Sequence, residues 1–135
     1  MKNIKTYIKE SFKLGDNNFK SRNERYKYFP KGKNELIDIL KSRIMEDPDA
    51  DLNDIDVSQI VNMSNLFENI DPHNVDISEW DVSNVENMNS MFNGCVNFNC
   101  DLSKWNVKNV KFMNKVFYNC TSLKEIPSWY KSDKI

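Results

Sequence analysis

Apolar positions recur every 25 residues between Asp51 and Phe117. The segment that begins at Asp51 returns at Asp76 and again at Asp101. The aligned apolar sets are Leu52/Ile77/Leu102, Ile55/Trp80/Trp105, Val57/Val82/Val107, Ile60/Val85/Val110, Met63/Met88/Met113, Leu66/Met91/Val116 and Phe67/Phe92/Phe117. A fixed period of this length is typical of a solenoid, in which each unit buries its apolar face against its neighbours. A solenoid favours a binding scaffold over an enzyme.

Each repeat contains two shorter patterns. Its first part alternates apolar and polar residues, as a β-strand does. Its second part places apolar residues at i, i+3 and i+4, which is typical of one helix face. The residues that follow, Asn69, Gly94 and Asn119, tolerate a left-handed C-cap. The patterns predict an α/β solenoid of about three 25-residue strand–turn–helix coils.

A helix is predicted immediately before the first repeat. Asn34 is a suitable N-cap for a helix over residues 35–44, and Asp47-Pro48 ends it. A solenoid needs such a cap, because its first coil would otherwise expose its core. We therefore expect a capping helix within residues 34–50 and a repeat solenoid over residues 51–135.

Residues 1–33 form a basic N-terminal arm with a predicted amphipathic helix over residues 2–14. We expect this helix to dock on the domain; a membrane surface or a separate partner is the alternative. Basic and aromatic residues alternate over 19–33, as in segments that bind single-stranded nucleic acid. That stretch is short and matches no nucleic-acid motif, so we favour a strand or linker packed on the core.

Charge is segregated along the chain although the net charge is only −1. Residues 1–33 carry ten Lys/Arg and three Asp/Glu, and residues 104–135 carry seven Lys and two acids. Residues 44–103 carry thirteen Asp/Glu and no Lys or Arg. Blocks of this kind govern the choice of partner more than the fold.

The sequence holds no catalytic or cofactor motif. It lacks a Ser-His-Asp set, a Gly-rich phosphate loop and an HExxH motif, so we expect no enzyme activity and no cofactor. His73 and three cysteines do not make a zinc site, and one Asp per coil (Asp51, Asp76, Asp101) favours turn caps over calcium. We expect no bound metal.

Cys95 and Cys120 lie one period apart, so a disulfide between adjacent coils is geometrically feasible. Reduced core residues are the favoured interpretation.

The first ten residues contain no uninterrupted apolar run, and no later segment reaches transmembrane length. We therefore expect a cytoplasmic protein that does not enter membranes.

Residues 80–95 read WDVSNVENMNSMFNGC, and residues 98–105 read FNCDLSKW. These stretches resemble the repeats of the BspA-like leucine-rich-repeat family. The resemblance covers residues 51–129, and residues 30–55 are similar to the segment that often precedes those repeats. It implies a leucine-rich-repeat-type fold and a role in protein binding. Members of that family are mostly secreted or surface proteins, whereas this chain is short and we expect it to have no export signal. That difference suggests, by analogy, a phage or mobile-element protein that acts on host machinery.

The exposed strand face is the predicted partner-binding site. If Leu52, Ile77 and Leu102 face inward, strand alternation turns their neighbours outward and puts charged residues at the next bend. The site residues are Asn53, Asp54, Ser78, Glu79, Ser103 and Lys104.

The sequence therefore predicts a non-enzymatic protein–protein interaction module. Its partner is a protein, basic or nucleic-acid-binding, and no small-molecule substrate is expected. One alternative is an inhibitor that imitates the phosphates of nucleic acid with its carboxylates. Another is head-to-tail self-assembly, with the acidic first coils of one copy meeting the basic last coil of another.

Overall fold

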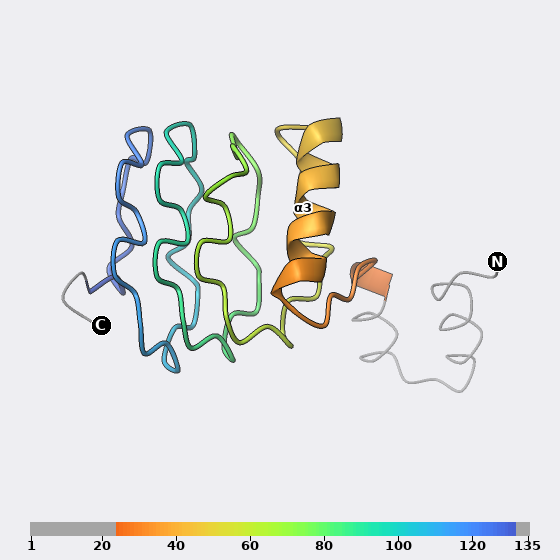
Figure 1. Cartoon of the computed structure of the whole chain (residues 1–135), viewed down its shortest axis with the longest axis horizontal. Helices are drawn as coiled ribbons and strands as arrows, with labels where there is room; N and C mark the ends of the chain where they lie inside the picture. Colours follow the sequence, from red (N-terminus) through yellow and green to blue (C-terminus); the bar gives the residue numbers. More distant parts are fainter. Residues whose placement is uncertain (1–23, 132–135) are drawn as a thin grey trace.

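The structure, a computed structural model, describes residues 24–131, so the expected helix over residues 2–14 lies outside them. The complete helix within the described residues is α3 (Lys33–Glu46). No strand forms there, and isolated parallel bridges join Tyr28 to Ile55, Asp51 to Asp76, Asn62 to Asn87 and Asn87 to Phe112. Figure 1 shows the repeats as coils lying side by side, with α3 at one end.

Helix α3 lies where the sequence places a helix, but it begins one residue before the expected N-cap. Its N-cap is Gly32 rather than Asn34, and the Glu35 carboxylate accepts a hydrogen bond from the Lys31 N–H at 2.9 Å. Leu36, Leu40 and Ile44 are its buried residues. Their spacing of four residues places them on one face, which packs in the common core.

The prediction of an α/β solenoid of strand–turn–helix coils is wrong. The helix expected in each repeat is replaced by turns, because Asn65, Ser90 and Lys115 adopt a positive φ of 56–58°. The N–H groups that a helix would use internally are instead donated to the next coil. Phe67 donates to Met91 O at 2.9 Å, and Phe92 donates to Val116 O at 3.0 Å.

The expected strands are reduced to single bridges, because the chain turns soon after each residue that pairs with the next coil. At Asp76, the N–H donates to Ala50 O at 3.0 Å and the carbonyl accepts from the Leu52 N–H at 2.9 Å. The chain then turns, with the Trp80 N–H donating to Ile77 O at 3.2 Å. Each coil is therefore a succession of turns linked to its neighbours, with too few consecutive bridges to make a strand.

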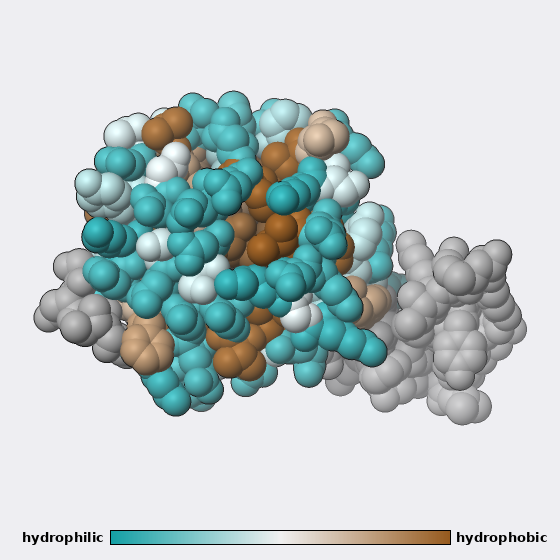
Figure 2. Space-filling view, viewed as in Figure 1, coloured by the Kyte–Doolittle hydropathy of each residue, from teal (hydrophilic) through white to brown (hydrophobic). Residues whose placement is uncertain are grey.

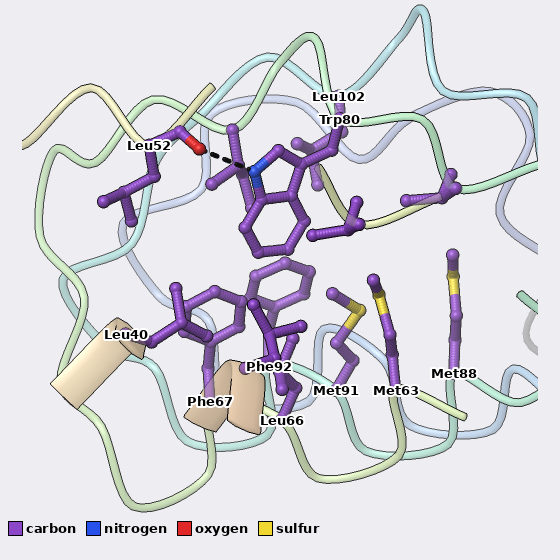
Figure 3. Close-up of a cluster of buried hydrophobic side chains, with 14 of the residues drawn as sticks. Leu40, Leu52, Met63, Leu66, Phe67, Trp80, Met88, Met91, Phe92 and Leu102 are labelled. Atoms are coloured by element: carbon purple, nitrogen blue, oxygen red, sulfur yellow. Dashed lines mark hydrogen bonds between the residues drawn. The ribbon is translucent and has the colours of Figure 1, made fainter. Parts of the chain in front are cut away.

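The core consists of columns of equivalent side chains from successive coils (Figure 3). Trp80 stacks on Trp105 with ring centroids 6.3 Å apart, and Trp105 stacks on Trp129 at 6.2 Å. Each indole N–H donates to a backbone carbonyl of the preceding coil. The acceptors are Leu52 O, Ile77 O and Leu102 O, at 2.9, 3.0 and 2.8 Å.

The three cysteines are free thiols. Cys95 donates to Phe67 O at 3.4 Å and Cys120 to Phe92 O at 3.0 Å, so each points at a carbonyl rather than at the other. Burial raises the pKa of Cys95 to about 12 and that of Cys120 to about 11. These thiols therefore serve as weak donors in the core.

The surface is mainly polar. On the face seen in Figure 2, apolar residues reach the surface in a strip over the junction between α3 and the nearest coil. Within residues 24–131, no helix has the length and hydropathy needed to cross a lipid bilayer.

Candidate functional site

Asn53 does not face outward as the strand pattern predicts. It is 8% exposed, and both its N–H and its side-chain amide donate to Asp51 Oδ1, at 3.0 and 2.9 Å. Its Oδ1 accepts the Glu79 N–H at 2.9 Å. Asn53 therefore links the first coil to the second and is not available to a partner. The strand-based argument fails here because the chain turns immediately after Leu52.

Ser78 and Ser103 follow the two later aspartates of the repeat. The Asp76 carboxylate accepts from the Ser78 N–H at 3.0 Å and from its hydroxyl at 2.7 Å. The Asp101 carboxylate accepts from the Ser103 N–H at 2.9 Å. Hydrogen bonds from Ser78 lower the pKa of Asp76, and those from Ser103 lower the pKa of Asp101. These carboxylates cap turns, as the sequence indicates.

Asp54 and Glu79 carry the strongest charge contacts of the predicted set. The Arg43 guanidinium of α3 donates to both Asp54 carboxylate oxygens, at 3.0 and 3.2 Å, and both side chains are 19% exposed. Arg25 pairs with Glu79 at 2.7 Å, where the side chains are 43% and 63% exposed. The structure thus adds Arg25 and Arg43 to the site.

These side chains line an open pocket of about 650 Å³, here called the charged pocket. It lies where the end of α3, the segment before it and the first two coils meet. The lining residues are Arg25, Lys27, Arg43, Glu46, Asp47, Ala50, Asp51, Asn53, Asp54 and Glu79. Five carboxylates and three basic groups sum to a net charge of −2.

The structure does not bring all six predicted residues together. Asn53, Asp54 and Glu79 line the charged pocket, whereas Ser103 lines a separate hollow of about 490 Å³ at the last coils. Ser78 and Lys104 line neither. Sequence reasoning missed Arg25, Lys27 and Arg43, because they lie outside the repeat. The signal for Arg25 and Lys27 was the basic block over residues 1–33, and Arg43 stands immediately before the acidic block.

The charged pocket suits charge recognition. Arg43 is fixed from three sides, since it also donates to Asp51 O at 3.2 Å and lies 5.0 Å from the centre of the Tyr28 ring. Among the residues that the structure describes, no cluster of three His, Cys, Asp or Glu could hold a metal ion. The pocket therefore offers fixed charges and open carboxylates.

A family model described as "Mycoplasma protein of unknown function, DUF285" matches residues 40–134. The chain belongs to this family. DUF285 is a repeat-associated family, related to but distinct from the BspA-like repeat proteins, so the predicted membership of the BspA-like family is wrong. No curated protein and no solved structure matches the chain. The DUF285 match includes Arg43, Asp54 and Glu79 and begins after Arg25 and Lys27.

Proposed function

We propose that this chain is a protein-binding module whose partner docks over the charged pocket. The observation that carries the proposal is the convergence of five carboxylates on one open hollow, inside a stretch of 60 residues without Lys or Arg. Glu46 and Asp47 are exposed, and neither forms an ion pair with a described residue. One Asp47 oxygen accepts the Asp49 N–H at 2.9 Å, and the Asp47 and Glu46 carboxylates can pair with a basic side chain of the partner.

The net negative charge of the pocket favours a partner protein with a basic surface. Opposite charges speed the encounter and set the orientation of the complex. Exposed pairs are screened over about 8 Å at physiological salt. Binding should therefore weaken as salt is added.

The test is affinity capture from a nuclease-treated lysate of the source organism, at low salt. The pocket variant carries Glu46→Lys with Glu79→Lys, two exposed positions whose replacement leaves the core intact. A matched control carries Glu86→Lys with Glu125→Lys, which changes the net charge equally outside the charged pocket.

We expect one stoichiometric protein on the wild-type chain and on the control, and its loss from the pocket variant. Equal capture by all three chains would contradict the proposed surface, and so would the absence of any specific protein.

The two alternatives have no separate observation in their favour. Head-to-tail assembly needs a free first coil, whereas Lys27, Tyr28 and α3 lie against it. Imitation of nucleic acid would become the better interpretation if the captured protein were a nucleic-acid enzyme that the chain competes away from its DNA or RNA.

A further inference from the structure

The outer edge of the first coil is occupied by the segment that precedes α3. Lys27 and Tyr28 donate their N–H groups to Asp54 O at 2.7 and 3.3 Å, and the Asp56 N–H donates to Tyr28 O at 2.9 Å. Tyr28 and Ile55 form a parallel bridge. Residues 25–28 are here called the leading segment, and its last two residues lie along the first coil as an outer strand lies along a sheet.

The side chains of the leading segment continue this contact. Arg25 reaches across to Glu79 of the second coil, 2.7 Å away, and Lys27 lines the charged pocket. The Tyr28 ring lies beside the Arg43 guanidinium, which Asp54 holds in place. The edge thus receives Lys27 and Tyr28, which follow a helical stretch that ends at Arg25. These positions bring two basic residues and an aromatic residue to the edge.

This contact is far lighter than those inside the stack. It consists of three backbone hydrogen bonds, one exposed ion pair, one cation–π contact and the packing of the half-buried Tyr28 ring against the core. Arg25 and Lys27 are exposed, and Tyr28 is half-buried. Segments with so few buried contacts open at the low end of a protein's local stability.

We infer that the leading segment is exchangeable and that the partner binds by replacing it with an extended basic–aromatic segment of its own. This rests on the proposed function and names the partner's chemistry. Addition of an extended peptide to an open edge gives affinity through the main chain and specificity through side-chain pockets. The chain's own segment lowers the apparent affinity, because only the fraction of molecules with a free edge binds.

The test uses a labelled peptide with the sequence of residues 24–31, ERYKYFPK, and the full chain. One chain is wild type, and the other carries Arg25→Glu with Tyr28→Ala to loosen the leading segment. We expect the peptide to bind the loosened chain at least tenfold more tightly than the wild type. A peptide with Glu at the positions of Arg25 and Lys27 is the matched control and should not bind.

Hydrogen exchange provides a second readout. The Asp56 N–H should exchange faster in the loosened chain and regain protection when the peptide is added, because its acceptor is Tyr28 O. If Tyr28→Ala disturbs folding, Arg25→Glu alone changes an exposed side chain and gives the same comparison.

Equal peptide affinity for both chains, or no renewed protection at Asp56, would overturn strand exchange. That result leaves the proposed function standing, because the capture experiment depends on the pocket carboxylates and not on the peptide. If the peptide binds but capture fails, the edge is exchangeable and the proposed protein-binding function is contradicted.

Discussion

The interior of the coil stack and its α3 end are held by different kinds of contact. In the interior, the same contact recurs in each coil, as with the indole N–H of Trp80, Trp105 and Trp129 donating to the preceding coil. At the α3 end, contacts occur once: Arg43 with Asp54, and Arg25 with Glu79. The recurring contacts bury aromatic rings, whereas the single contacts join charges at the surface.

This difference separates stability from recognition. A fully buried aromatic or aliphatic side chain contributes about 1.5–3 kcal/mol through burial, whereas an exposed ion pair contributes about 0–1 kcal/mol. The interior can therefore hold the fold while the α3 end changes its contacts. Contacts that break the 25-residue period are the ones to examine for function.

Truncation of Phe92 should have the largest effect. Phe92 is fully buried and stacks on Phe67, Phe98 and Phe117 at 5.1, 4.4 and 5.7 Å between ring centroids. Phe92→Ala should lower the free energy of unfolding by about 3–5 kcal/mol. Urea denaturation followed by circular dichroism measures it. Phe112→Ala, at a ring that is 42% exposed, is the control; an equal loss there would contradict the role of the columns.

Removal of an indole donor should lower the free energy of unfolding by less than Phe92→Ala does, and by the same amount in two different coils. Trp80→Phe and Trp105→Phe each keep a ring and leave a buried carbonyl, Leu52 O or Ile77 O, without its donor. Each should lower the free energy of unfolding by about 1–3 kcal/mol. Losses that differ widely between the two variants would show that the contacts do not act as equivalent units.

Loss of Arg43 should cost less than either interior change. Arg43→Met leaves the half-buried Asp54 carboxylate without its partner, at a cost of about 1 kcal/mol in the free energy of unfolding. Arg25→Met removes the exposed ion pair with Glu79 and should change the free energy of unfolding by less than about 0.5 kcal/mol. A double-mutant cycle with Asp54→Asn isolates the Arg43 pair, and zero coupling would contradict a fixed ion pair.

The thiol protons of the cysteines should have no effect on stability at neutral pH, and their effect should appear only in alkali. Because burial raises the pKa of Cys95 to about 12 and that of Cys120 to about 11, the folded chain keeps thiol protons that the unfolded chain loses above about pH 9. Stability is unaffected below pH 9 and falls as the pH rises toward 11–12, by less than about 1 kcal/mol per thiol at pH 9.5. Cys95→Ala with Cys120→Ala should flatten that decline in thermal unfolding. An unchanged slope would contradict buried thiols.

The sequence predicts the repeat positions well and the local structure poorly. Leu52, Ile77 and Leu102 are all buried, because inward positions follow from the period alone. The strands and helices within the coils fail, because the N–H groups are donated to the next coil and a left-handed residue interrupts each expected helix. Ser90 and Lys115 are not residue types that usually adopt a left-handed backbone conformation, so the sequence does not predict it there.

The residues of the candidate site also fall into two groups: those whose position follows from the repeat period and those that only the structure reveals. Asp54 and Glu79 lie 25 residues apart, so their closeness follows from the period. Arg25 and Arg43 come from outside the repeat, and only the structure shows that they reach the same pocket. The predicted outward position of Asn53 is wrong, because strand alternation does not apply where the chain turns after Leu52, and both residues are buried.

The constant spacing between coils also has a consequence for folding kinetics. Hydrogen bonds between coils join residues 24 to 28 positions apart, such as Met63 to Asn87 and Trp80 to Leu52. The entropy of loop closure therefore costs about the same at each step. The Arg43–Asp54 contact closes a shorter loop of 11 residues, so nucleation should begin beside α3 and each later coil should dock on a finished template.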